Sequence, residues 1–144
     1  MDSVGLDTNV LLDFFAADRP EHPLAVSLFR ELRLSNATVC VVATSMKDVY
    51  CVLGRTHGRA VAQGAVAAMM ATMTVLPVDD ACCRTALAST EPDFGDGIVR
   101  AAAETAQVTY LISRDRRAFV GSRVSCLTPA EALHELAHKR PADG

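Results

Sequence analysis

Four aspartates spread along the chain could together hold a divalent cation. Asp7 and Asp115 each come at the end of a short apolar run, whereas Asp48 and Asp96 lie near the expected starts of two helices. Carboxylates that share one site cannot all stay ionised cheaply unless positive charge lies among them. All-oxygen ligation suits Mg²⁺ or Mn²⁺ rather than zinc. If the fold brings these side chains together, they predict a magnesium or manganese site.

Each of these acids also has a simpler explanation. Asp7 could do no more than cap the helix that begins near Asn9, by accepting unpaired backbone N–H groups. Asp48, Asp93 and Asp96 are expected at helix starts, where an acid stabilises the helix by roughly 0.3 to 1 kcal/mol. Both explanations stay open for any single residue, and only the joint pattern favours a shared site.

Strands and helices alternate along the whole chain. Apolar, β-branched runs predict strands at residues 4–6, 38–42, 74–76, 109–112 and 124–126. Apolar residues at helical spacing predict helices in the intervals and after residue 128. We therefore predict an α/β fold of three layers, α/β/α and Rossmann-like, with a mostly parallel sheet of about four to five strands. In such a sheet the junctions from strand to helix share one edge, so the four acids could meet there.

Two of the expected helices bear on the site or on partners. The helix capped by Thr44 or Ser45 is expected to end at Gly54, which puts Asp48 in its first turn. The helix from residue 59 to 73 is apolar on almost every side and needs cover on more than one face. Its outer face is either buried as well or a surface for a second subunit or another partner.

Length and composition predict one domain over residues 1–144, because half of the 144 residues are hydrophobic. No run of eighteen apolar residues could span a bilayer, and Asp2 stands where a secretory signal would carry positive charge. We therefore expect a cytoplasmic protein without a membrane contact. The five cysteines form no C-x-x-C motif, which favours reduced core residues over a zinc ribbon or a disulfide framework.

The formal net charge of −3 at pH 7 at first argues against a nucleic-acid partner. The charge becomes +1 when the four candidate ligands, which bound cations would neutralise, are left out. Arginine is the better bidentate ligand of phosphate. Four arginines are candidates for contacts with phosphates: Arg55, Arg59, Arg114 and Arg116. For any one of them, an ordinary solvated surface charge is at least as good an explanation.

Four short motifs resemble those of the PIN-domain ribonucleases and follow the same order. They are D-T-N-V-L-L-D at 7–13, K-D-V-Y-C-V-L at 47–53, D-F-G-D at 93–96 and L-I-S-R-D at 111–115. S-C-L-T-P-A-E-A-L at 125–133 resembles the end of that domain, so the resemblance covers nearly the whole chain. The small size is similar to that of the VapC-like toxins of type II toxin–antitoxin pairs.

This resemblance implies a PIN-like fold and cleavage of RNA that depends on Mg²⁺ (or Mn²⁺). The implied ligands of one or two metal ions are Asp7, Asp48, Asp96 and Asp115. A metal ion makes an attacking water available near neutral pH and neutralises charge that develops on the phosphate. A cognate antitoxin and a homodimer are further implications of the family.

Three further residues match supporting positions of the family. Asn9 and Ser113 match polar positions that orient ligands or waters, and Asp93 is a weaker supporting candidate. The chain departs from the family pattern in two places. Asp48 stands where glutamate is commoner, which shortens its reach, and Gly97 follows Asp96 where a small helix former is expected.

Two other functions compete with this one. H-E-L-A-H at 134–138 matches the zinc-protease motif, in which His134 and His138 bind zinc and Glu135 acts as the base. A catalytic zinc needs a third protein ligand, usually downstream, and only six residues follow this motif. The second competitor is a PIN fold that has lost catalysis and binds RNA or protein. The complete set of four acids argues against it.

Overall fold

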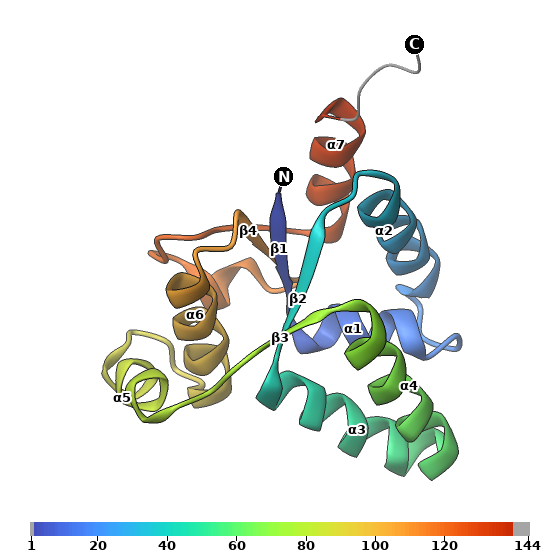
Figure 1. Cartoon of the computed structure of the whole chain (residues 1–144), viewed down its shortest axis with the longest axis horizontal. Coiled ribbons are helices and arrows are strands. Elements are labelled where there is room, and N and C mark those ends of the chain that lie inside the picture. Colours follow the sequence, from blue (N-terminus) through green and yellow to red (C-terminus); the bar gives the residue numbers. More distant parts are fainter. Residues whose placement is uncertain (1, 140–144) are drawn as a thin grey trace.

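A parallel sheet forms the centre of the computed structural model, which describes residues 2–139 (Figure 1). The five strands of the described chain are β1 (Ser3–Leu6), β2 (Thr38–Val42), β3 (Thr74–Leu76), β4 (Tyr110–Ile112) and β5 (Ser125–Leu127). Their order across the sheet is β3-β2-β1-β4-β5, and every neighbouring pair is parallel. The predicted sheet is confirmed, and no predicted strand end differs by more than one residue.

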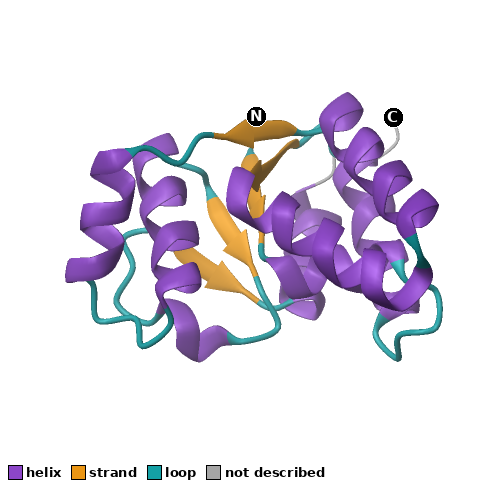
Figure 2. Ribbon diagram, turned by 90° about the horizontal axis from the view of Figure 1, so that it is seen from below, coloured by secondary structure: helices purple, strands orange, loops and turns teal. Residues whose placement is uncertain are grey.

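Helices cover both faces of this sheet (Figure 2). Within residues 2–139 they are α1 (Thr8–Phe15), α2 (His22–Leu34), α3 (Ala43–His57), α4 (Arg59–Thr72), α5 (Asp80–Ala88), α6 (Phe94–Ala106) and α7 (Pro129–Lys139). α5 and α6 share one core with Val42 and Leu111, whereas the other helices share a second core with Val41 and Ile112. Successive strand residues thus serve opposite faces, as a buried parallel sheet requires. The predicted three-layer fold is confirmed.

The direction in which strands are added reverses between β1 and β4. From β1 the chain adds β2 and β3 on one side, and it then returns to add β4 and β5 on the other. In open α/β sheets, a ligand crevice lies beyond the carboxyl ends of the strands at such a switch point. Asp7 follows β1 directly, and its backbone N–H donates to the carbonyl of Ile112 at the end of β4 (3.0 Å).

Helix α3 starts earlier than predicted. It begins at Ala43, immediately after β2, and not after a cap at Thr44 or Ser45. Asp48 is therefore beyond the first turn, and the prediction that it stabilises a helix start is wrong. The early start follows from the backbone: Val42 is still extended as the last residue of β2, so the chain turns into the helix without a loop.

The end of α3 also differs from the prediction. Gly54, expected to close the helix, lies within it and faces Ala62 of α4, and the helix continues to His57. Gly58 ends it with φ of +91°, a backbone conformation that glycine adopts without strain. A short 3-10 helix at Arg116–Phe119, which the sequence analysis did not predict, follows Asp115.

The departure at Gly97 has a packing explanation. A Cβ built on Gly97 would lie 3.1 Å from the carbonyl oxygen of Ala86 and 3.2 Å from its Cβ. Glycine therefore lets α6 approach α5 closely near the start of α6.

Within residues 2–139, no helix combines the length and the hydropathy that crossing a bilayer requires.

Candidate metal-binding cleft

A cleft of about 290 Å³ opens at the switch point, and its walls come from α1, α3 and α6. The residues that line it are Asp7, Thr8, Asn9, Leu12, Thr44, Ser45, Asp48, Asp93, Gly95, Asp96 and Val99. Three of the four predicted ligands thus share one cleft with the supporting candidates Asn9 and Asp93. Asp115 is not among the lining residues.

Asp7 caps α1 and lines the cleft at the same time, so its two explanations are not alternatives. Its Oδ1 accepts a hydrogen bond from the backbone N–H of Thr8 (2.9 Å). Its Oδ2 accepts one from Ser113 Oγ (2.7 Å) and a longer one from Asn9 Nδ2 (3.4 Å). Burial raises the pKa of Asp7 above its usual value, and the bonds from Ser113 and Thr8 offset only part of that rise.

Asp96 lies in the electric field of the neighbouring acids. Asp93 caps α6, and its Oδ1 accepts from the backbone N–H of Asp96 (3.0 Å), which fixes the first turn of the helix. Burial, followed by repulsion from Asp7, Asp93, Glu91 and Asp115, raises the pKa of Asp96 to about 6. Such a shift is expected where carboxylates gather without a counter-ion.

Ser113 connects Asp115 to Asp7. Its side chain is fully buried, donates to Asp7 Oδ2 and accepts from the backbone N–H of Asp115 (3.0 Å). The Asp115 carboxylate is about half exposed and accepts from the backbone N–H of Arg117 (3.1 Å), so it also starts the 3-10 helix. Asp115 therefore stands beside the cleft and is held there through Ser113.

Asp48 lines the cleft from α3, but its carboxylate is paired with a neighbour. Lys47 Nζ lies 2.9 Å from Asp48 Oδ1, and both side chains are substantially exposed. Exposed ion pairs of this kind contribute little stability. A cation in the cleft could therefore draw Asp48 away from Lys47 at small cost.

The donor set fits a hard divalent cation, although the ligands are not drawn together into a finished coordination sphere. Within residues 2–139, no three His, Cys, Asp or Glu side chains converge closely enough to coordinate one ion directly. The cleft nevertheless offers carboxylate oxygens from Asp7, Asp48, Asp93 and Asp96. Mg²⁺ commonly keeps several of its waters and takes only one or two carboxylates. This donor chemistry suits such a partly hydrated ion.

Three of the four candidate phosphate-binding arginines, Arg55, Arg59 and Arg114, are not among the residues that line the cleft. Arg55 and Arg59 are exposed near the junction of α3 and α4. Arg114 is held by a buried acid of α1, because its Nε lies 2.7 Å from Asp13 Oδ2. The side chain of Arg116 is outside the part of the structure that is described.

The H-E-L-A-H motif forms no zinc site in the described residues. His134 and His138 are exposed on α7, with ring centroids 4.1 Å apart, and Nδ1 of His138 is bonded to the carbonyl of His134 (2.9 Å). Glu135 lies 3.7 Å from Lys139 Nζ. Residues 2–139 supply no third ligand to this pair, and the geometry does not support a protease.

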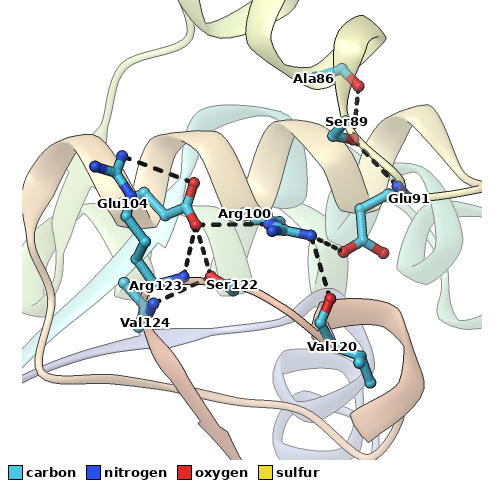
Figure 3. A network of polar contacts seen from close by, with 9 residues as sticks. All are labelled: Ala86, Ser89, Glu91, Arg100, Glu104, Val120, Ser122, Arg123 and Val124. Carbon is cyan, nitrogen blue, oxygen red and sulfur yellow. Dashed lines mark hydrogen bonds and ion pairs between the residues drawn. The ribbon is translucent and has the colours of Figure 1, made fainter.

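A polar network around Arg100 and Glu104 connects α6 to the loop before it and to the loop of residues 120–123 (Figure 3). Arg100 Nη1 lies 2.9 Å from Glu91 Oε1 and also donates to the carbonyl of Val120 (3.4 Å). Glu104 Oε2 lies 3.5 Å from Arg100 Nε and accepts from Ser122 Oγ and the backbone N–H of Arg123 (2.9 Å each). α6, which carries Asp96, is thereby tied to the loop before it and to the segment after Asp115.

The sequence analysis missed this network and the pairing of Asp13. Only the spacing of Arg100 and Glu104, four residues apart on a helix, was a visible signal. Asp13 interrupts an apolar stretch of α1, and a buried acid there needs a cation; Arg114 and Arg19 provide it, the latter at 2.9 Å. The chemistry of the residues predicted the need for a partner but not its identity.

Comparison with known proteins gives the same fold. The chain resembles VapC20 of Mycobacterium tuberculosis, a toxin that cleaves the sarcin–ricin loop (TM-score 0.66, 16% identity, 75% of this chain and 86% of that chain). It also resembles a toxin–antitoxin complex from Klebsiella pneumoniae (0.66, 19%, 88% and 97%) and PAE2754 from Pyrobaculum aerophilum (0.67, 15%, 96% and 97%). A sequence search of curated proteins finds no match.

A family model supplies the sequence evidence that these distant structures lack. The model of the PIN domain matches residues 3–117, which is most of the chain and includes Asp7, Asp48, Asp96 and Asp115. The fold, the motif order and this match agree. The chain belongs to the PIN-domain family.

Proposed function

We propose that this protein is a Mg²⁺-dependent endoribonuclease and the toxin of a toxin–antitoxin pair. The observation that carries the proposal is the set of acids around one cleft at the switch point, where burial and mutual repulsion raise the pKa of Asp7 and Asp96. Membership of a nuclease family supports it. The resemblance to a toxin that cleaves the sarcin–ricin loop supports RNA as the substrate.

In this proposal the carboxylates of Asp7, Asp48, Asp96 and Asp115 hold the metal. Bound Mg²⁺ (or Mn²⁺) supplies Lewis-acid activation of a water and neutralises charge on the phosphodiester. Ser113 and Asn9 keep the Asp7 carboxylate in place through their hydrogen bonds, and Asp93 fixes the helix turn that presents Asp96. Asp48 and Asp115 are more exposed, so their carboxylates would be able to adjust on metal binding.

We propose that positively charged side chains outside the cleft bind the phosphates of the RNA. Arg55 and Arg59 are exposed and suited to phosphate contacts, and we retain Arg116 as a candidate on its sequence position. Arg114 was a candidate of the same kind. Through its ion pair with Asp13, we propose instead that Arg114 holds the loop of residues 113–115 against α1.

A free ribonuclease would harm its own cell, so the proposal includes an antitoxin that blocks the cleft. The resemblance to a chain in a toxin–antitoxin complex supports such a partner. An arginine of the antitoxin could occupy the place of the metal among the carboxylates.

We also propose a cytoplasmic homodimer. The exposed Val61 and Met70 on the outer face of α4 are consistent with a second subunit there.

An RNA cleavage assay tests the enzyme proposal. The purified protein should cleave RNA with Mg²⁺ or Mn²⁺ and not with EDTA, and Asp7→Asn and Asp96→Asn should each slow cleavage on the order of 10³-fold. Asp80→Asn is a matched control, because Asp80 is exposed and pairs with Arg84 on α5. Cleavage that persists at the wild-type rate in both cleft variants would contradict the proposal, and a protease would instead respond to Glu135→Gln.

A PIN-fold module that only binds RNA or protein remains the alternative. It would show no metal-dependent cleavage of any RNA, and neither cleft variant would alter its binding. Expression of the wild type alone should arrest growth, whereas Asp96→Asn should not. Growth arrest by both forms would favour the binding module over the nuclease.

A further inference from the structure

The three helices that line the cleft differ in how their starts are capped. Asp7 caps α1, and Asp93 caps α6. No side chain caps α3, although Thr44 and Ser45 in its first turn line the same cleft. The first backbone N–H groups of any helix lack partners within the helix. The start of α3 therefore presents uncapped donors beside the carboxylates.

Ser45 provides a second, independent sign of a missing ligand. The residue is 1% exposed, and its Oγ is buried with no hydrogen-bond partner. Leaving a buried hydroxyl unpaired is unfavourable. A serine in a helix often bonds to the carbonyl four residues earlier, but Ser45 does not. Because Ser45 lines the cleft, an oxygen of a ligand that enters there is the natural partner for this hydroxyl.

We propose that the start of α3 is a phosphate subsite. The Ser45 hydroxyl and the backbone N–H groups of Thr44 and Ser45 bind a phosphate oxygen of the nucleic acid. The amino end of α3, a helix of fifteen residues, adds partial positive charge from its dipole. This inference rests on the proposed function, because it names where the substrate phosphate of that site is held.

The same cleft explains why the subsite should bind phosphate much more tightly when a divalent cation is present. Asp7, Asp48, Asp93 and Asp96 repel an anion from the cleft as long as their charges are uncompensated. A cation held by these carboxylates would remove that repulsion. The donors at the start of α3 would then bind an oxygen of the phosphate and help to orient it in the cleft.

A titration of the whole protein with inorganic phosphate tests the subsite directly. The backbone amide signals of residues 43–45 are followed by NMR, with and without Mg²⁺. We expect these signals to shift with phosphate when Mg²⁺ is present, and to shift much less without it. If the signals of residues 43–45 do not respond to phosphate in the presence of Mg²⁺, the inference is overturned.

Ser45→Ala sharpens the test, with Ser35→Ala as its matched control. Ser35 Oγ is also buried without a partner, but Ser35 lies at the end of α2, outside the cleft. Both substitutions remove an unpaired hydroxyl and should leave Tm unchanged or raise it. Only Ser45→Ala should weaken phosphate binding, by about two- to tenfold for one lost hydrogen bond. Equal phosphate affinity in the two variants would overturn the role of Ser45.

The outcomes separate this inference from the proposed function. Phosphate binding at residues 43–45 without RNA cleavage would leave the subsite standing and reject the nuclease. RNA cleavage with unchanged Michaelis constant and unchanged rate in Ser45→Ala would leave the nuclease standing and reject the role of Ser45 in holding the substrate phosphate. Because the NMR titration uses the wild type, the test does not depend on whether a variant folds.

Discussion

Two groups of acids in this protein are compensated in opposite ways. Behind α6, Glu91 and Glu104 are both close to Arg100, and in α1 Asp13 is close to Arg19 and Arg114. In the cleft, Asp7 and Asp96 have no cationic partner within ion-pair distance among the side chains that the structure describes, which exclude that of Arg116. Both groups lose solvation on burial. Among the described side chains, only the first group gains cationic partners that offset this loss.

The pKa shifts express the same contrast. Burial raises the pKa of Glu104, but hydrogen bonds from Arg123 and Ser122 and the charge of Arg100 bring it below the usual value. Burial and neighbouring acids raise the pKa of Asp96 to about 6. An acid that the fold needs for its own stability is paired. The unpaired acids of the cleft are therefore the ones available to a cation from outside.

The largest expected effect is the loss of activity in Asp96→Asn. This substitution removes a negative charge but keeps the size of the side chain, so the fold should survive. We expect the rate of RNA cleavage to fall on the order of 10³-fold, comparable to the loss of a preorganised electrostatic partner in other enzymes. Single-turnover cleavage of a short RNA measures it. A rate within threefold of the wild type would contradict a catalytic role of Asp96 and leave it only a structural one.

For Arg100→Met we expect a loss of stability, not a direct loss of catalysis. It leaves Glu91, whose side chain is 2% exposed, without its cation. Removal of one partner of a buried ion pair costs about 3–5 kcal/mol of unfolding free energy. Urea unfolding measures the loss, with Arg84→Met as the control, because Arg84 forms an exposed pair with Asp80. Equal stability of Arg100→Met and Arg84→Met would show that the fold does not depend on the pairing of Glu91, and would contradict the contrast with the cleft acids.

A smaller effect is the pH dependence that Asp96 imposes on the metal-free protein. The unfolded chain releases this proton near pH 3.8 and the folded chain near pH 6, so the folded state binds more protons in between. Stability contributed at this site therefore falls as pH rises from about 4 to 6. The Tm of Asp96→Asn should match the wild type near pH 4 and exceed it at pH 7. Mg²⁺ should reduce or reverse the difference at pH 7.

Glu104→Gln should show the opposite sign and the smallest effect of the series. The pKa of Glu104 is lower in the folded state than its usual value of 4.5, so its contribution is present above that pH and is lost as pH falls through the folded pKa. The variant should melt below the wild type at pH 7 and approach it under acid conditions. Thermal unfolding at both pH values tests it. A higher Tm at pH 7 would contradict the assignment.

The sequence predicted those features that depend on local pattern and on the geometry of parallel sheets. β-branched runs located the strands, and the shared edge of the sheet brought Asp7, Asp48 and Asp96 to one cleft. It did not predict the start of α3, because Thr44 and Ser45 have the chemistry of caps but lie inside the helix.

Contacts between distant segments were also out of reach. Arg100 contacts Glu91 and Val120, which are 9 and 20 residues away on loops whose paths no local pattern defines. Asp13 and Arg114 are 101 residues apart. Each buried charge signals that a partner exists, but only the packed structure shows which one.

The most direct measurement is anomalous X-ray scattering from crystals soaked in Mn²⁺. We infer that Asp7 and Asp96, which pair with no described cationic side chain, are the cleft acids that hold a divalent cation. We predict an anomalous peak among the carboxylates of Asp7, Asp96 and their neighbours, and no such peak in Asp96→Asn. A wild-type cleft without Mn²⁺, or a peak only at His134 and His138, would contradict this account.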